Sequence, residues 1–286
     1  MKTAFKTLTL VLAAGLCTAA RAGLFSDNFE MTVVAERAKD APAPQDGPMA
    51  CAVVDGGYIE AGDAIAGEDP PPADFVKSQV EGALAQQGFR AGVSPALLVT
   101  YHWGILRVDH QQIRVPYGIN SNLDARINLV STDATGAEVE NHILGKEKGG
   151  GQSNDASSPP ILVGPLETIV ENARKPRYFI ILSAYDYASV AQHQPKLVWR
   201  TKLSAQETSG SMPEIIPSLI AQGAPFFAKD ILLPKIVEAS ITKAPTYPQS
   251  DNAGPQTAVA SSDSGAVDSV VKQEQTQFSG NGVAKG

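Results

Sequence analysis

Cysteine is scarce in this sequence, which contains two of them, Cys17 and Cys51. Cys17 lies in an amino-terminal segment that we expect to be removed, so Cys51 is left alone. A lone cysteine cannot form an internal disulfide, and this excludes a small disulfide-stapled scaffold. The domain must therefore rely on its hydrophobic core. We interpret Cys51, which lies between two alanines, as a small buried residue rather than a reactive or intermolecular thiol.

Long hydrophobic runs are also missing, because no segment beyond the start of the chain approaches the roughly 18 apolar residues of a membrane-spanning helix. The run at residues 8–16 is shorter and follows two lysines. Residues 20–22 read Ala-Arg-Ala, a small-x-small cleavage site. This pattern predicts a secretory signal peptide over residues 1–22, a mature chain that starts at Gly23, and a periplasmic or secreted protein.

Cys17 leaves one alternative address open, a lipid anchor at the outer membrane. Leu16 precedes the cysteine at a position where lipobox sequences carry a small residue, so we favour cleavage before Gly23. Mass spectrometry of the mature amino terminus distinguishes the two addresses, since one leaves a free Gly23 and the other an acylated Cys17.

Positive charge is in deficit, with 23 Lys and Arg against 30 Asp and Glu. Removal of the signal peptide takes away Lys2, Lys6 and Arg21 and changes the formal net charge from −7 to −10. Nucleic acids and anionic membrane surfaces are poor partners for such a chain, because both are themselves negative. We therefore expect a protein or another envelope component as partner, and the sequence does not define the oligomeric state.

The residues that are present alternate between helix and strand patterns. Val76, Val80, Ala83 and Leu84 recur at spacings of three and four after a Pro-Pro-Pro lead, which predicts a helix that starts near Asp74 and stops at Gly88. Residues 97–103 are short, β-branched and aromatic and predict a strand, with Trp103 in the core. Further strands are expected at residues 29–35, 51–54, 58–62, 125–131, 138–144, 177–187 and 195–203, and further helices at residues 165–175 and 213–229.

These elements predict an α+β fold with one mixed, largely antiparallel sheet and helices packed on one face. Residues 177–187 are apolar on both faces and are expected at the centre of the sheet, whereas the alternation in residues 195–203 indicates a wet face nearer the edge. The glycines at positions 56 and 57 predict a turn between two short strands, and residues 125–131 and 138–144 could pair as a hairpin.

The composition divides the chain into three parts. After the signal peptide, residues 23–243 form a single domain, inside which the Gly- and Ser-rich residues 145–160 predict a mobile loop. From residue 244 to residue 286 the chain loses aromatics and β-branched runs, so we expect a disordered tail.

No catalytic motif is apparent, and the sequence predicts no metal site and no cofactor. The densest group of ionisable residues is His102 with Asp109 and His110, whose spacing is not that of known metal ligands. Asp186, at the end of the central strand, and Glu207, after the following one, are further candidates for a pocket or surface site. For all five residues, ordinary solvated or hydrogen-bonded side chains are the simpler interpretation.

A resemblance extends over about residues 29–229. The helix ending in Gln87-Gly88-Phe89, the strand at residues 96–101, the Lys-Leu-Val-Trp-Arg of residues 196–200 and the Ile-Ile-Pro-Ser-Leu of residues 215–219 follow one another as in a family of uncharacterised bacterial envelope proteins, often lipoproteins. The chain is similar to this family in its sheet and helix patterning. The resemblance implies an envelope address and an α/β sandwich, and it brings no known activity and no site residues.

We hypothesise a non-enzymatic, periplasmic or secreted module that binds or assembles an envelope component. The alternative is a hydrolase, metal-dependent or not, that uses the region from His102 to His110. A buried polar pocket that joins two histidines to a carboxylate would favour the enzyme. A shallow apolar patch or an exposed sheet edge would favour the binding module.

Overall fold

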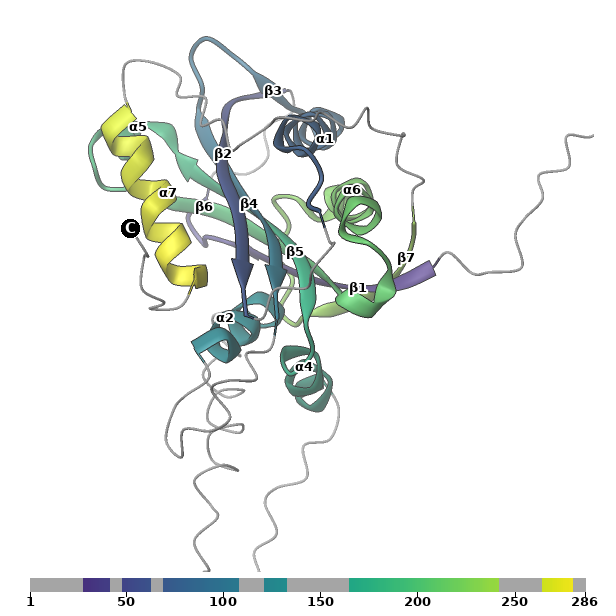
Figure 1. Ribbon diagram of the computed structural model, residues 1–286. Coiled ribbons are helices and arrows are strands. Elements are labelled where there is room, and N and C mark those ends of the chain that lie inside the picture. The colour runs from purple at the N-terminus through teal and green to yellow at the C-terminus, as the bar shows by residue number, and fades with distance from the viewer. Residues whose placement is uncertain are drawn as a thin grey trace, which may run out of the picture.

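The computed structural model describes residues 28–41, 48–62, 69–107, 121–132, 165–241 and 264–279. The strands of these residues form one seven-stranded sheet in the order β3-β2-β4-β5-β6-β1-β7 (Figure 1). The pairs β2·β3 and β2·β4 are parallel and the other four pairs are antiparallel, which confirms an α+β fold with a mixed, largely antiparallel sheet. The strands are β1 (Asn28–Arg37), β2 (Met49–Ala61), β3 (Phe89–Ala91), β4 (Leu97–Leu106), β5 (Arg177–Asp186), β6 (Leu197–Gln206) and β7 (Lys235–Ser240).

Helices cover both faces of the sheet, so the expectation of helices on one face is incomplete (Figure 1). We call the face under α1 and α6 the first face, and the face under α2, α4, α5 and α7 the second face. No helix of the described residues is both long enough and apolar enough to cross a membrane. The helices are α1 (Ala73–Gln86), α2 (Ser121–Val130), α4 (Pro165–Ala173), α5 (Tyr187–Ala191), α6 (Met212–Gly223) and α7 (Ser264–Ser279), with 3-10 turns at Glu207–Ser209 and Ala224–Phe226.

The first face is built as the sequence predicts. The apolar stripe of α1 is buried, and Gly88 follows the helix in the left-handed conformation, with a φ of 86°. Asp74 lies in the first turn but does not cap the helix, whose N-cap is Pro72. Cys51 and Trp103 are both 2% exposed, which confirms their interpretation as core residues.

The central position of β5 is confirmed, but the expected edge position of β6 is wrong. β6 lies between β5 and β1, and its basic residues Arg200 and Lys202 are buried. Lys202 Nζ donates to the carbonyl oxygens of Asn128 and Ser131 at 2.8 and 2.9 Å. A buried cation at the C-terminal end of α2 is stabilised by the helix dipole and by these carbonyls, so the alternating pattern does not indicate a wet face here.

The strand expected at residues 125–131 is instead part of α2. The strand was predicted because Arg126 was counted as a solvent-facing residue, but this residue is buried. Its Nε donates to Ala173 O, at the end of α4, at 2.7 Å, and its Nη1 donates to Arg107 O at 2.8 Å. All residues from 125 to 132 except Asn128 are buried, so polar residues in this segment do not mark a solvent-facing side as they would in a half-exposed strand. The hairpin partner at residues 138–144, the loop at residues 145–160 and the signal peptide lie outside the described residues.

Two further corrections concern the second face. β2 runs through the glycine pair as one strand with a bulge between Asp55 and Tyr58, where a turn was expected, and Gly57 has a φ of 96°. Residues 264–279, placed in a disordered tail, form α7. Their composition is polar, yet Ala266, Val270 and Glu274 recur every four residues as one buried stripe. The rest of the tail is not among the described residues.

Candidate functional site

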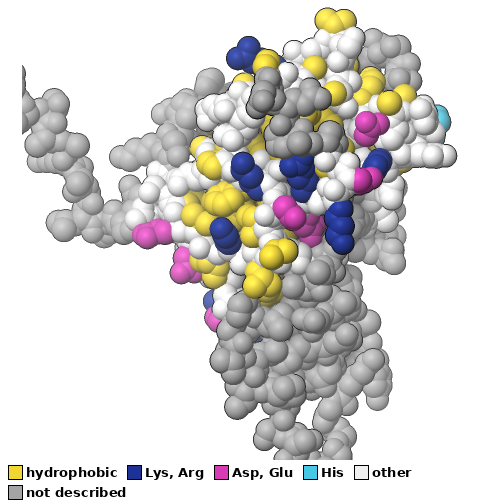
Figure 2. Space-filling model, turned by 180° about the vertical axis from the view of Figure 1, so that it is seen from behind, with side chains coloured by type: hydrophobic (Ala, Val, Ile, Leu, Met, Phe, Trp, Pro, Cys, Tyr) yellow, Lys and Arg dark blue, Asp and Glu magenta, His cyan; other side chains and the backbone are white. Residues whose placement is uncertain are grey.

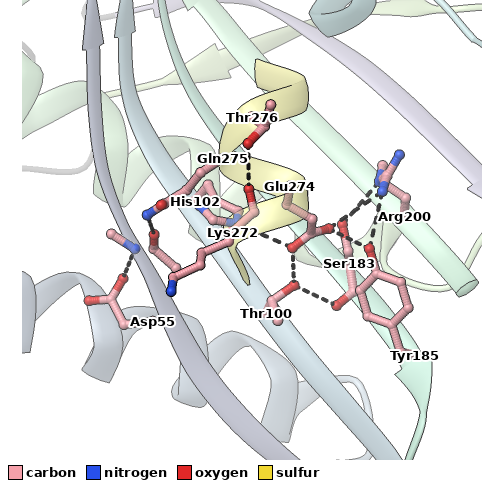
Figure 3. A network of polar contacts seen from close by, with 12 residues as sticks. Asp55, Thr100, His102, Ser183, Tyr185, Arg200, Lys272, Glu274, Gln275 and Thr276 are labelled. Carbon is pink, nitrogen blue, oxygen red and sulfur yellow. Dashed lines mark hydrogen bonds and ion pairs between the residues drawn. The ribbon is translucent and has the colours of Figure 1, made fainter. Parts of the chain in front are cut away.

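The most unusual feature of the described structure is the way in which α7 lies on the second face. Ala266 and Val270 of this helix pack in a small hydrophobic cluster with Leu98, Tyr185 and Val190. The third inward position of the helix is a carboxylate, Glu274, which points between β4, β5 and β6 (Figure 3). We call this carboxylate and the side chains that contact it the Glu274 site.

Both oxygens of the Glu274 carboxylate accept hydrogen bonds, and the side chain is 2% exposed. Oε2 accepts from Thr100 Oγ1 at 2.6 Å and lies 3.2 Å from His102 Nε2. Oε1 accepts from the Tyr185 hydroxyl at 2.7 Å and from Arg200 Nη2 at 3.4 Å. Four side chains from three strands thus converge on one ion, as a buried charge requires.

The register of the sheet brings these donors together. Thr100 pairs with Ser183 across β4 and β5, and Ser183 pairs with Arg200 across β5 and β6, so the three residues form one row. Arg200 Nε donates to Ser183 Oγ at 3.0 Å, and Arg200 Nη2 donates to the Tyr185 hydroxyl at 3.3 Å. These contacts fix the position of the Arg200 guanidinium beside the Glu274 carboxylate.

The site lowers the pKa of Glu274 to about 2. Burial by itself raises this pKa, but the hydrogen bonds and charge of His102, and the hydrogen bonds of Ser183 and Thr100, outweigh it. The pKa of Tyr185 is raised, first by burial and then by the charge of Glu274. At neutral pH the site therefore holds an ionised carboxylate next to a protonated phenol.

This shift gives the docking of α7 a pH dependence. In a released helix Glu274 would have its ordinary pKa of 4.5, whereas the docked carboxyl has a pKa of about 2. The contribution to docking is complete above about pH 4.5 and is lost as the pH falls from there towards about 2. We expect the NMR resonances of α7 amides to move to released positions in this window. Resonances that stay unchanged down to about pH 2 would contradict the assignment.

A second contact ties α7 to the bulge of β2. Gln275 Nε2 donates to Gly56 O at 2.6 Å, one residue along the helix from Glu274 (Figure 3). The Cα of Gly56 lies against the His102 ring, and a Cβ at this position would be 2.2 Å from its Cε1 atom. His102 Nδ1 is buried without a hydrogen-bond partner among the described residues, so the contact of the ring with the Glu274 site is made through Nε2.

Replacement of Gly56 by alanine should therefore disturb the site through His102. The new methyl group would overlap the ring, which must turn away from Glu274 and give up one donor of the carboxylate. We expect α7 to become more open to hydrogen exchange while the strands stay protected. Gly82→Ala, where a Cβ meets nothing within 4 Å, is the matched control. Equal α7 exchange in both variants would show that the ring position is unimportant.

Of the five residues selected from the sequence, the structure places one in this site. His102 is fully buried at its centre, whereas Asp109 and His110 lie outside the described residues. Asp186 accepts from Ser189 N at 2.7 Å and caps α5.

Glu207 accepts from Arg107 Nε at 2.8 Å. His102 pairs with Ile181 in the middle of β5. Asp186 lies at one end of β5, and Glu207 follows the end of β6 that pairs with the opposite end of β5. Each carboxylate is therefore more than about 10 Å from His102 along the strand direction. Neither carboxylate belongs to the Glu274 site.

Most of the Glu274 site cannot be found from the sequence. Thr100 and His102 share the less apolar face of their strand in the sequence pattern, which is the one available signal. Glu274 is 172 residues away from His102 in the chain, in a segment of polar composition. Arg200 looked like a solvated residue of a wet face.

The chemistry of the site is that of a carboxylate receptor. No group of three or more His, Cys, Asp and Glu side chains that could hold a metal ion occurs among the described residues. Every oxygen of Glu274 is engaged, so the carboxylate is not available as a general base while α7 is docked. The donors are a hydroxyl, a phenol, an imidazole and a guanidinium, a set that suits a bidentate anion.

Comparisons with known proteins define no family for this fold and site. No family model matches the chain, and no curated protein matches it. Among solved structures, the chain is similar to PelC from Paraburkholderia phytofirmans, a dodecamer in space group P6 and a variant dodecamer in space group C2. Each match has 12% identity and a TM-score of 0.32 and covers 70% of this chain and 99% of PelC. A likeness of this size assigns neither function nor assembly to this chain.

Proposed function

We propose that this protein is a non-enzymatic, periplasmic or secreted envelope module that binds or assembles partners through the second face of its sheet. The observation that carries the proposal is the Glu274 site, where four donors from three strands bind one carboxylate of a helix. The signal-peptide pattern at the start of the chain supports the exported address.

The docking of α7 depends on polar contacts as well as on apolar burial. Ala266 and Val270 are the well-buried apolar side chains of the described part of this helix, and their burial is worth roughly 3 kcal/mol. The surface beneath Glu274 is lined by hydroxyl, imidazole and guanidinium groups, which water can solvate. A helix held in this way can leave without exposing the main hydrophobic core, which lies on the first face.

The charged surface agrees with a protein partner rather than with a polyanion. Figure 2 shows Lys and Arg interspersed with Asp and Glu on the face in view, with hydrophobic groups between them and no continuous basic area. The part of this face that the structure describes therefore lacks the continuous basic area that a nucleic-acid-binding surface presents.

The hydrolase alternative requires His102 to act with Asp109 and His110. Within the described residues, His102 is joined to a single carboxylate and to no second histidine, and its Nε2 is engaged by Glu274. Asp109 and His110 lie outside the described residues, so this contact bears on His102 alone.

A cleavage experiment tests the proposal. A protease site is placed within residues 244–262 of the full mature chain, the purified protein is cut, and a fluorescent peptide of residues 264–279 is added. If α7 is a releasable ligand, the labelled peptide replaces it while the sheet stays folded, as followed by fluorescence anisotropy and circular dichroism. If the cut helix leaves only when the whole domain unfolds, the second face is ordinary core and the proposal fails.

A further inference from the structure

We infer that the Glu274 site selects its partners by chemistry: it binds an acidic amphipathic helix of another protein that presents an ionised glutamate. The inference rests on the proposed function, and it names the partner class. In the structure, α7 shows how such a helix is seated.

The first part of the selection is the carboxylate itself. Oε2 accepts from Thr100 and faces His102 Nε2, and Oε1 accepts from Tyr185 and Arg200. Glutamine has the same shape but is neutral, and its NH2 group cannot accept the hydrogen bonds that one of the two Glu274 oxygens accepts. Aspartate is shorter by one methylene and cannot reach both pairs of donors from the same backbone position.

The second part is the spacing of residues along the helix. Val270 and Ala266 lie four and eight residues before Glu274, and both are inserted beside Leu98 and Tyr185. Gln275 follows the glutamate and donates to Gly56 O in the bulge of β2. A partner helix should therefore carry small or β-branched residues four and eight positions before a Glu-Gln pair.

The third observation concerns the contact between Arg200 and the carboxylate of α7. Arg200 Nη2 lies 3.4 Å from Oε1, which is longer than the roughly 2.9 Å usual for a charge-assisted hydrogen bond. A helix whose carboxylate approaches the guanidinium more closely would bind more tightly than α7. Such a helix could replace α7 even though α7 belongs to the same chain as the sheet and is therefore present at a high effective concentration.

Peptide competition on the cut protein tests this selection. The reporter is the fluorescent 264–279 peptide, and the competitors are the unlabelled peptide and its Glu274→Gln, Glu274→Asp and Asp268→Asn variants. Asp268 is exposed on α7, so its variant removes the same charge without touching the site. We expect the Glu274→Gln and Glu274→Asp peptides to compete about 30-fold less well, and the Asp268→Asn peptide to compete like the original.

A change in the protein separates selection from folding. Arg200→Met should reduce the preference for the original peptide over the Glu274→Gln peptide to a few-fold, with circular dichroism used to establish that the domain is folded. If that variant does not fold, Tyr185→Phe, which removes one donor at Oε1, serves instead and should lower the preference.

The outcomes separate the two proposals. If the glutamine peptide competes within about threefold of the original, this inference is wrong while the binding function stands. If the reporter does not exchange at all, the proposed function fails and this inference fails with it. If unlabelled full-length protein displaces the reporter better than any supplied peptide, the partner is a second copy of this chain, and the assignment to another protein is overturned.

Discussion

Replacement of Glu274 by glutamine should release α7 from the second face at neutral pH. The neutral amide cannot accept from all four donors, and it leaves Arg200 buried without this carboxylate. Breaking a buried, hydrogen-bonded ion pair costs about 3 kcal/mol or more. This loss is comparable to the whole apolar contribution of Ala266 and Val270, so little is left to hold the helix.

The measurement is the chemical shift of α7 amides in the full-length protein, compared between Glu274→Gln and Asp268→Asn. Both variants remove one negative charge from the same helix, but only the first changes the site. We expect the α7 amides of Glu274→Gln to have the chemical shifts of an undocked segment, and those of Asp268→Asn to have the shifts of the unmodified protein. Native shifts in both would show that apolar packing alone holds the helix, and released shifts in both would point to net charge instead of the site.

Replacement of Gly104 by alanine should have the largest effect on the stability of the whole domain. Gly104 lies in β4 with a φ of 150°, and a Cβ on it would be 1.9 Å from the carbonyl oxygen of Ile59 in β2. Backbone atoms cannot move aside as a flexible side chain can, so the two strands must separate locally. We expect a loss of about 3 kcal/mol in the free energy of unfolding.

Urea unfolding of this variant, followed by circular dichroism, gives the free energy directly. Gly82→Ala is again the control: Gly82 lies in α1 with open space around its Cα, so alanine should stabilise by roughly 0.5 to 1 kcal/mol. The two substitutions add the same methyl group and should shift the urea midpoint in opposite directions. A Gly104→Ala midpoint at or above that of the unmodified protein would contradict the close approach of β2 and β4.

The parts of the fold that the sequence predicts well are those whose burial is mainly apolar. Residues 178–182 of β5 are hydrophobic on both faces, and the central position of the strand follows from that run, although Arg177 at its start is buried as well. The helix α6 begins with a capping box, in which the Ser211 Oγ lies 2.6 Å from Glu214 Oε2, and it carries a continuous apolar stripe. In these elements local preference and tertiary packing agree.

The errors fall where charged side chains are buried. Four charged residues are buried although their type predicts solvent exposure: Arg126 in α2, Arg200 and Lys202 in β6, and Glu274 in α7. When these residues are counted as solvent-facing, α2 is predicted as a strand and β6 is predicted near the edge of the sheet. For the same reason α7 is predicted as part of a disordered tail. Their partners are distant in sequence or are backbone carbonyls, which no local pattern contains.

The site shares this difficulty. His102 could be selected because histidines are few, and its strand has a recognisably less apolar face. The carboxylate that it contacts, and the arginine that completes the site, are brought to it by strand register and by the docking of α7. Neither relation is visible before the sheet is assembled.

Native-state hydrogen exchange of the full mature chain tests most directly whether α7 is a ligand held on a folded sheet. Segments that open separately exchange with different opening free energies. We expect α7 amides to exchange through a low-energy opening that leaves the amides of β4, β5 and β6 protected, and Glu274→Gln to lower that energy further. If α7 and β5 exchange with the same opening free energy, the helix is an integral part of the core and the binding account is wrong.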